Sequence, residues 1–330
     1  MNKKNWLCLF LAGALTLTAF NSCKKSEDND TTDSGPTEWV KSSAFDGDPR
    51  SNAASFQIDN TGFLATGILS TNERVKDAWS FNNSIWTKIA DFGGEARNLA
   101  VGFSIDGKGY IGTGFNGTDA LSDFWKYDPT ANTWTKIADF PGEARYGAVA
   151  FTLGGYGYVG TGATKTQKTL KDFYRYDPTT DSWSVVNTPF ENKRVNAFAF
   201  VVGNKAYIGG GFDNNTNPED FYSFDGTSWA KLAPLKDETA TYDLTRQSAS
   251  TFVIGNYGYV VGGKKAQGTA LNTTWKYDPA KNEWNNIHQS LPQNAREGAV
   301  SFSISSKGYL TTGANGSFKF DDTWVFTPVR

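Results

Sequence analysis

Six arginines recur through this chain of 330 residues, each a short distance before a run of small and apolar residues. They stand in stretches such as GEARNLAVGF, GEARYGAVAF and NAREGAVSF. The six are Arg50, Arg97, Arg145, Arg194, Arg246 and Arg296. A guanidinium group is a planar fork that can pair with a carboxylate through two parallel hydrogen bonds. If the chain folds as repeats, the spacing predicts a ring of candidate anion-binding groups.

Two interpretations of this ring are open. Six guanidinium groups that converge on one opening would make a funnel of positive potential that attracts an anionic ligand. Alternatively, a residue that recurs in every repeat is typical of a structural element. The arginines would then form ion pairs with neighbouring acidic residues. Glu95 and Glu143, two positions before their arginines, and aspartates of nearby loops are the candidate partners.

A repeat with a nearly fixed period runs through the chain. Its marker is a glycine or alanine followed by an aromatic residue, recurring at steps of 47, 48, 49, 52 and 50 residues. Each pair leads into a short apolar stretch with glycine, as in GYIGTG, AYIGGG and GYVVGG. The pairs are Gly62–Phe63, Gly109–Tyr110, Gly157–Tyr158, Ala206–Tyr207, Gly258–Tyr259 and Gly308–Tyr309. Self-similarity at this period indicates a repeat architecture.

An aromatic segment and a tryptophan complete each unit. Segments such as DFWKYD and DFYSFD are followed by turns such as YDPTANTW and FDGTSW. Asp-Pro suits the start of a type I turn, and Asp-Gly suits a tight hairpin. From Trp39 onward, all ten tryptophans fall on two repeat positions. Four short strands in each unit predict the blade of a β-propeller.

The number of blades follows from the two ends of the repeat. Six glycine–aromatic or alanine–aromatic pairs are present, but the last unit ends at Arg330 without its final tryptophan. Trp39, 47 residues before Trp86, supplies one at the other end. We therefore expect an all-β, six-bladed propeller over residues 38–330, whose amino-terminal strand completes the last blade. This closure leaves no exposed strand edge at the seam.

These residues resemble the Kelch repeat, with its glycine-rich second strand followed by a tyrosine and, six residues later, a tryptophan. Within the Kelch family, the chain resembles bacterial propellers of the N-acetylneuraminate epimerase and galactose-oxidase-like group. It departs from the family's diglycine where four units carry Thr-Gly: Thr66–Gly67, Thr113–Gly114, Thr161–Gly162 and Thr312–Gly313. A WD40 propeller is the competing fold, but the chain has one histidine and no Trp-Asp dipeptide.

The resemblance implies a ligand-binding face. Kelch domains commonly bind ligands where the chain enters the channel from the preceding blade, and arginines at this position hold carboxylates in related proteins. Loops on the same face differ most between units, and the connection 232–246 is enlarged like a partial lid. Aromatic residues of this face are candidates for stacking on a sugar or peptide ring, namely Phe115, Tyr146, Phe212 and Tyr242. Ordinary surface packing is the alternative for each of them.

The chain lacks the residues that several classes of catalytic and metal-binding site require. His288 is the single histidine, so neither a histidine metal cage nor a Ser-His-Asp triad can form, and we expect it to face solvent. The copper chemistry of galactose oxidase needs histidines and a cysteine-crosslinked tyrosine, which the chain cannot supply. We expect no metal and no cofactor. With 32 basic and 34 acidic residues and no basic patch, we expect no nucleic-acid partner.

Residues 1–22 have the pattern of a bacterial signal peptide, with a basic start, an apolar run and a small, polar end. Ser22–Cys23 resembles the end of a lipobox, where cleavage leaves a lipidated amino-terminal cysteine, although Phe20 departs from the usual Leu or Val. Cleavage of an ordinary signal peptide near the same place is the alternative.

Residues 23–37 are polar and acidic, as expected for a flexible tether. Their SEDND run resembles signals that export some lipoproteins to the outer surface. We therefore expect a monomeric outer-membrane lipoprotein at the cell surface, in contact with the membrane only through its anchor. Exposure on the periplasmic face is the alternative.

Two functional classes are open. The first is a noncatalytic binding module for a glycan or protein ligand of anionic character. The second is an enzyme that resembles N-acetylneuraminate epimerase and acts on an acidic sugar, which needs a positioned acid or base and an arginine clamp. Glu95, Glu143 and Glu297 are conceivable acid/base groups. The expected lipid anchor favours binding, because that epimerase is typically soluble and periplasmic.

Overall fold

The computed structural model describes residues 38–239 and 241–329, which consist of strands, turns and loops without a helix. The described residues belong to one compact unit. The predicted leader (1–22), the lipidated Cys23 and most of the tether lie outside the described residues. Within the part that is described, nothing is helical over the length that a membrane crossing requires.

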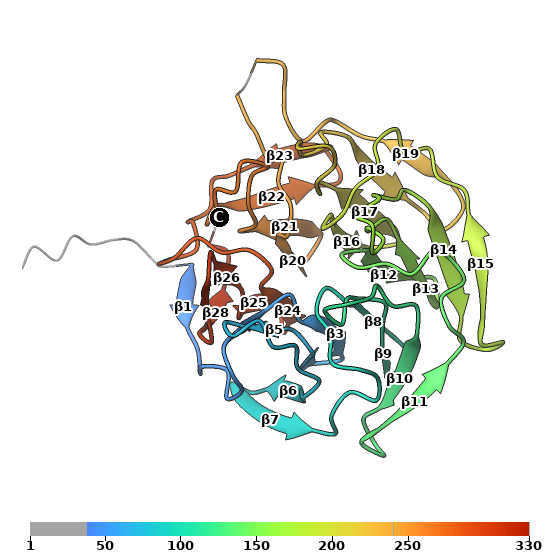
Figure 1. Cartoon of the computed structure of the whole chain (residues 1–330). Coiled ribbons are helices and arrows are strands. Elements are labelled where there is room, and N and C mark those ends of the chain that lie inside the picture. The colour runs from blue at the N-terminus through green and yellow to red at the C-terminus, as the bar shows by residue number, and fades with distance from the viewer. Residues whose placement is uncertain (1–37, 240, 330) are drawn as a thin grey trace, which may run out of the picture. The chain divides into compact units, whose positions relative to one another are not determined.

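Six four-stranded antiparallel sheets are arranged radially around a common axis (Figure 1), and their inner strands line a central channel. The innermost strands are β3 (Ala54–Ile58), β8 (Val101–Ile105), β12 (Val149–Leu153), β16 (Phe198–Val202), β20 (Ser250–Ile254) and β24 (Val300–Ile304). The second strands are β4 (Thr61–Ala65), β9 (Lys108–Gly112), β13 (Tyr156–Gly160), β17 (Lys205–Gly209), β21 (Tyr257–Val261) and β25 (Lys307–Thr311). The sheets are blades 1 to 6 in chain order.

The outer half of each blade carries the aromatic segment and the tryptophan. The third strands are β6 (Ala78–Asn82), β10 (Phe124–Asp128), β14 (Phe173–Asp177), β18 (Phe221–Phe224), β22 (Thr274–Asp278) and β28 (Thr323–Phe326). The outermost are β7 (Ile85–Ile89), β11 (Thr133–Ile137), β15 (Ser182–Val186), β19 (Trp229–Lys231), β23 (Glu283–Asn285) and β1 (Trp39–Lys41). Two short pairs lie outside the blades: β2 (Arg50–Ser51) with β5 (Ile68–Leu69), and β26 (Ala314–Asn315) with β27 (Phe318–Lys319).

The predicted ring closure is confirmed. Strand β1 pairs with β28, with Trp39 opposite Phe326, so both ends of the described chain lie in blade 6 (Figure 1). The expectation that His288 faces solvent is wrong, because its side chain is fully buried and its Nδ1 lies 2.8 Å from Oε1 of Glu38. Glu38 is also buried and belongs to the closing segment. The histidine is therefore part of the seam.

The inner strands alternate between the blade interfaces and the channel. In β8, Val101, Phe103 and Ile105 are buried between blades, whereas Gly102 lines the channel. This alternation is the period-2 pattern of a strand with one apolar and one open face. The recurring glycine of the second strand has a packing reason: a Cβ on Gly109 would lie 2.1 Å from the Phe56 ring of the preceding blade.

A closed ring of six backbone hydrogen bonds joins the blades around the channel. Each N–H in this ring donates to the carbonyl of the equivalent residue in the preceding blade, at 2.7 to 2.9 Å. All six residues have left-handed backbone, with φ between 54° and 60°. The ring consists of Asn52, Leu99, Gly147, Asn196, Ser248 and Gly298. The ring gives a hydrogen-bond partner to six backbone amide groups that lie beside a cavity.

Candidate ligand-binding mouth of the channel

The six predicted arginines lie at equivalent places, but their side chains are buried, with 0 to 1% of each residue exposed. Five pair with an aspartate that stands just before the third strand of the same blade. The pairs are Arg50–Asp77, Arg97–Asp123, Arg145–Asp172, Arg194–Asp220 and Arg296–Asp322. Four of these arginines bind both carboxylate oxygens, and Arg194 binds one.

Blade 2 shows how the pair is built. Nη1 and Nη2 of Arg97 donate to the two carboxylate oxygens of Asp123 at 2.6 and 2.8 Å, and Nη1 also donates to the Thr113 carbonyl. The guanidinium lies 5.0 Å from the ring centre of Phe92. Burial alone would raise the pKa of Asp123, but the hydrogen bond and charge of Arg97, with a bond from Trp125, hold it below its ordinary value. The pair ties the start of one blade to its third strand.

The expectation of a funnel of exposed guanidinium groups is therefore corrected, and the ion-pair interpretation holds for five of the six arginines. The predicted partners Glu95 and Glu143 supply backbone carbonyls to Nε of Arg97 and Arg145, not carboxylates. The carboxylate of Glu95 accepts from Asn116, and that of Glu143 pairs with Lys168.

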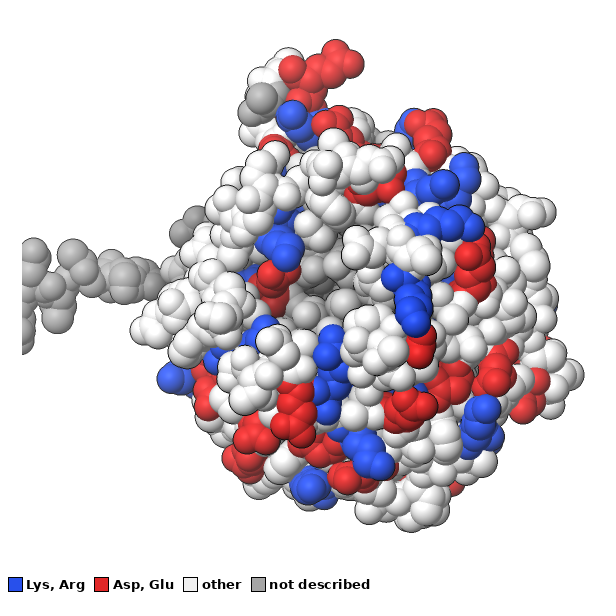
Figure 2. Space-filling model, viewed as in Figure 1, with Lys and Arg blue, Asp and Glu red and all other residues white. Residues whose placement is uncertain are grey.

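The residue after each arginine lies at the channel mouth. These residues pair with the loop that follows the second strand, through β2–β5 in blade 1 and through single bridges elsewhere. They differ in every blade: Ser51, Asn98, Tyr146, Val195, Gln247 and Glu297. Figure 2 shows the hollow at the centre of one face, with charged side chains at its rim. The arginine is thus the same in every blade, whereas the residue that follows it differs.

A cavity of about 240 Å³ opens at the mouth between blades 3 and 4. Two of the predicted aromatic residues, Tyr146 and Phe212, line it, together with amide side chains and one carboxylate. Those polar residues are Gln167, Asn196, Asn214, Gln247 and Asp213. Phe115 packs against Tyr146, with ring centres 5.5 Å apart, and the Arg74 guanidinium lies over the Phe115 ring. Burial raises the pKa of the Tyr146 hydroxyl, which keeps it a neutral hydrogen-bonding group.

Across the mouth, blades 5 and 6 carry two lysines and one carboxylate. Lys264 pairs with Glu297 at 2.8 Å, and Lys319 donates to the Ser51 hydroxyl at 3.0 Å. Burial lowers the pKa of Lys319, and the nearby charge of Lys264 lowers it further, while Glu297 opposes both. This side of the mouth carries a net positive charge.

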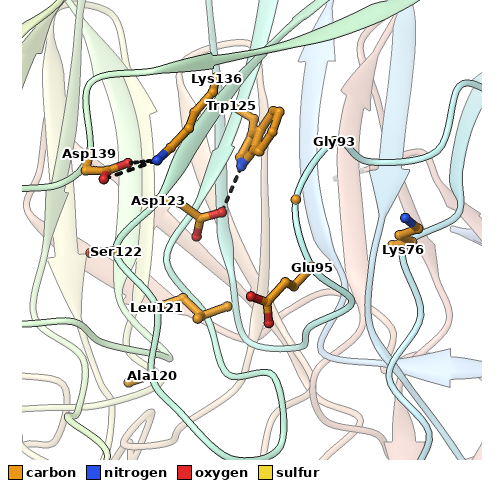
Figure 3. A pocket seen from close by; sticks show the side chains of 11 residues that line it. Lys76, Gly93, Glu95, Ala120, Leu121, Ser122, Asp123, Trp125, Lys136 and Asp139 are labelled. Atoms are coloured by element: carbon orange, nitrogen blue, oxygen red, sulfur yellow. Dashed lines mark hydrogen bonds and ion pairs between the residues drawn. The ribbon is translucent and has the colours of Figure 1, made fainter.

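A larger open groove of about 590 Å³ lies on the outer side of the Arg97–Asp123 pair, between blades 1 and 2. Figure 3 shows Lys136 paired with Asp139 and Asp123 bonded to the Trp125 indole, whereas Lys76 and Glu95 lie apart from these groups. A similar groove of about 470 Å³ lies beside Asp220 in blade 4. Because the groove recurs with the repeat and three of its charged side chains, Asp123, Lys136 and Asp139, are already paired, the mouth is the better candidate site.

The fourth aromatic residue of the predicted site lies elsewhere. Tyr242 belongs to the enlarged connection of blade 5, where it packs against Trp275 with ring centres 6.3 Å apart. Its hydroxyl donates to the Pro234 carbonyl. It does not line the mouth cavity. Among residues 38–239 and 241–329, no group of histidine, cysteine and acidic side chains is arranged to hold a metal ion.

The repeats and the fold match a known family. The KLHDC2/KLHL20/DRC7 Kelch-repeats domain matches residues 32–211 and again residues 148–330. The chain belongs to the Kelch-repeat family. No curated protein matches it. The solved structure of YjhT is similar in fold, with a TM-score of 0.74, 18% identity, and coverage of 87% of this chain and 97% of that one.

Four blades carry threonine in place of the first glycine of the Kelch diglycine, and this threonine has an unfavourable backbone conformation. Thr66, Thr113, Thr161 and Thr312 stand where other blades have glycine, and all four have left-handed backbone with φ between 59° and 69°. The carbonyl of each threonine accepts a hydrogen bond from the arginine of its blade. The arginine therefore holds a conformation that a β-branched residue otherwise avoids.

Proposed function

We propose that this Kelch propeller is a noncatalytic binding module that holds a carbohydrate ligand in the mouth cavity of blades 3 and 4. The observation that carries the proposal is the lining of that cavity, in which two aromatic rings stand among amide side chains. Sugars present apolar C–H faces to aromatic rings and hydroxyl groups to amides, each of which can donate and accept.

The charge at the mouth supports a ligand with an acidic group. Lys264 and Lys319 lie near one carboxylate, that of Glu297, which pairs with Lys264, so an additional anion would be attracted to this side. The buried arginines do not serve this purpose directly, because five of them already hold an aspartate. An acidic oligosaccharide would place a sugar ring in the cavity of blades 3 and 4 and its acidic group beside the lysines of blades 5 and 6.

The enzymatic alternative, an epimerase of acidic sugars, depends on a carboxylate in the cavity. Glu95, Glu143 and Glu297 do not line it, whereas Asp213 does. Asp213 accepts hydrogen bonds from Thr169 and Asn214, which fix the position of its carboxylate. NMR of anomer exchange with N-acetylneuraminate separates the two proposals. Exchange that is catalysed by the wild type and lost in Asp213→Asn would favour the enzyme.

We further propose that the propeller is tethered to the outer membrane through Cys23 and acts at the cell surface. The leader pattern and the acidic segment 23–37 support this location. A mass measurement of the mature wild type and of Cys23→Ala tests the anchor. The wild type should carry the mass of a lipid group that Cys23→Ala lacks, and equal masses after correction for the substitution would contradict the anchor.

A glycan array tests the binding proposal, with neutral and acidic oligosaccharides probed in parallel. The wild type should retain acidic glycans, and Phe212→Ala should lose them. Tyr156→Ala is the matched control, because Tyr156 lies at the hairpin end of blade 3, away from the mouth, against Arg175. Absence of any retained glycan, or equal retention by Phe212→Ala, would contradict the proposal.

A further inference from the structure

In blades 1, 2 and 6, the aspartate that stands before the third strand (the repeat aspartate) accepts hydrogen bonds from three side-chain N–H groups. Its carboxylate accepts from both Nη atoms of the arginine and from Nε1 of the tryptophan two positions later. The indole bonds are 2.7 Å for Trp79 to Asp77, 2.8 Å for Trp125 to Asp123 and 2.7 Å for Trp324 to Asp322. A planar carboxylate thus fits between a guanidinium fork and an indole N–H.

Blade 5 has the equivalent arginine and tryptophan, Arg246 and Trp275, but no aspartate before its third strand. Thr273 occupies its place, since the Thr273 carbonyl bonds the Gly262 amide as the Asp123 carbonyl bonds the Thr113 amide. Arg246 still donates through Nη1 to the Gly262 carbonyl and through Nε to the Leu244 carbonyl. Trp275 Nε1 and Thr273 Oγ1 are buried, and neither has a hydrogen-bond partner among the described residues.

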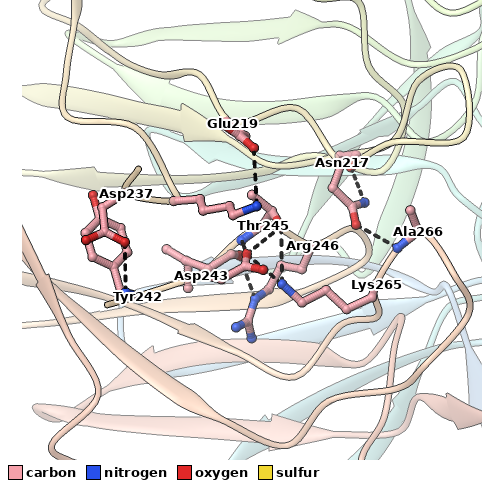
Figure 4. Close-up of polar contacts among 12 residues, drawn as sticks. Asn217, Glu219, Asp237, Tyr242, Asp243, Thr245, Arg246, Lys265 and Ala266 are labelled. Carbon is pink, nitrogen blue, oxygen red and sulfur yellow. Dashed lines mark hydrogen bonds and ion pairs between the residues drawn. The ribbon is translucent and has the colours of Figure 1, made fainter. Parts of the chain in front are cut away.

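Nearby charges do not replace the missing aspartate. Asp243 is the carboxylate closest in sequence, but Lys265 Nζ holds it at 2.7 Å and the hydroxyl and amide of Thr245 also donate to it. Figure 4 shows Arg246 beside this cluster. Burial without an ion pair lowers the pKa of Arg246, opposed only by the charge of Asp243. A buried guanidinium without a paired carboxylate is unfavourable, because its charge has lost water without gaining a counter-charge.

The surroundings are polar. Lys265 and Lys236 lie near Arg246 and pair with Asp243 and Glu219, and Asp237 accepts from the Tyr242 amide. The side chain of Asp243 is 42% exposed and that of Lys265 is 23% exposed, so this ion pair separates the buried guanidinium from solvent. The enlarged connection of blade 5, with Tyr242 against Trp275, covers the other side.

We propose that blade 5 binds a small carboxylate anion between Arg246, Trp275 and Thr273, beside the donors that hold the repeat aspartate in blades 1, 2 and 6. The anion accepts from the guanidinium, the indole N–H and the threonine hydroxyl. A monocarboxylate matches the site better than a spherical halide, because the three blades with the complete set use two coplanar oxygens. This site is separate from the mouth cavity and does not depend on the function proposed for it.

Chemical denaturation of the purified protein tests the site with sodium formate, against sodium chloride at the same ionic strength. Formate should raise the unfolding midpoint of the wild type to a plateau, because a ligand that binds only the folded state stabilises it. Thr273→Asp supplies the carboxylate within the chain. It should be more stable than the wild type without formate and should lose the formate response.

Blade 2 offers a matched gain-of-site variant. Asp123→Thr recreates the blade 5 arrangement around Arg97 and Trp125, so it should be destabilised and should recover part of the loss in formate but not in chloride. An equal response of the wild type to chloride and formate, or a formate response that Thr273→Asp retains, would overturn the proposal.

Indole N–H NMR of the wild type provides a test that does not rely on any variant's stability. The Trp275 signal, assigned by its absence in Trp275→Phe, should shift saturably with formate, while that of Trp125, whose N–H is already bonded to Asp123, should not. A Trp275 signal that stays fixed through the titration would overturn the site.

Discussion

Nδ1 of His288 lies 2.8 Å from Oε1 of Glu38, although 250 residues separate them in the chain. The same carboxylate accepts from the amides of Gln289 and Val329, at 2.7 and 3.2 Å. Glu38 stands next to β1, so its carboxylate fastens the amino-terminal strand to blades 5 and 6. The ring is thus closed by strand pairing and by one buried acid together.

Glu38→Gln should lower the free energy of unfolding by about 3 kcal/mol, because it removes a buried charge that several donors share. Equilibrium unfolding in urea measures this change. Glu283→Gln, on an exposed position of β23, is the matched control and should leave the midpoint unchanged. Equal midpoints for Glu38→Gln and the wild type would show that the seam does not depend on this carboxylate.

Acid should destabilise the fold through its buried carboxylates. Burial alone would raise the pKa of Glu38 and Asp123, yet hydrogen bonds and the nearby His288 or Arg97 hold both below their ordinary values. A carboxyl group whose folded pKa is lowered contributes stability above its unfolded value and loses it as the pH falls. The free energy of unfolding should therefore be level from about pH 7 to 5 and fall below about pH 4. Urea titrations across this range check it; stability that rises on acidification would contradict the assignment.

The Arg194–Asp220 pair is the most buried of the five, with 0 and 4% of the two side chains exposed. Asp220→Asn should lower the free energy of unfolding by about 3 to 5 kcal/mol, because it leaves the guanidinium without a counter-charge. Thermal and urea unfolding measure the loss. The exposed Lys231–Glu191 pair lies in the same blade, and Lys231→Gln should change little. Equal effects of the two substitutions would contradict a structural role for the buried pair.

Leu99 is the one large apolar residue in the hydrogen-bonded ring, with φ of 56°. Leu99→Gly should raise the free energy of unfolding by about 1 kcal/mol, because glycine adopts the left-handed backbone without the cost that a leucine bears. Leu99→Ala keeps that cost and should not stabilise the protein. Urea unfolding of the three proteins tests this ranking, and a destabilised Leu99→Gly would contradict it.

The blade number and the closure could be predicted from the sequence because their markers contact one another across blades. Gly109 recurs since the Phe56 ring excludes a Cβ there, and Trp39 was assigned to the last blade because its counterpart is missing at the other end. The placement of His288 could not be predicted, since its partner is distant in sequence and lies in the closing segment.

The site was predicted only in part. The positions of the arginines were visible, but not their partners, because each aspartate lies 26 or 27 residues downstream of its arginine. A signal was present in the sequence: five of the six third strands are preceded by aspartate, and Thr273 breaks the pattern. The cavity around Tyr146 and Phe212 depends on how two neighbouring blades face each other, which the spacing of repeats does not specify.

Arg145 and Tyr146 are neighbours with opposite roles: the arginine is buried against Asp172, and the tyrosine faces the cavity. Calorimetric titration of an acidic glycan retained on the array, into the wild type, Tyr146→Ala and the control Tyr156→Ala, tests this division most directly. We predict that Tyr146→Ala loses at least about tenfold in affinity, a cost of about 1.4 kcal/mol, while Tyr156→Ala binds as the wild type does. Unchanged affinity in Tyr146→Ala, or an equal loss in both variants, would contradict binding at the mouth.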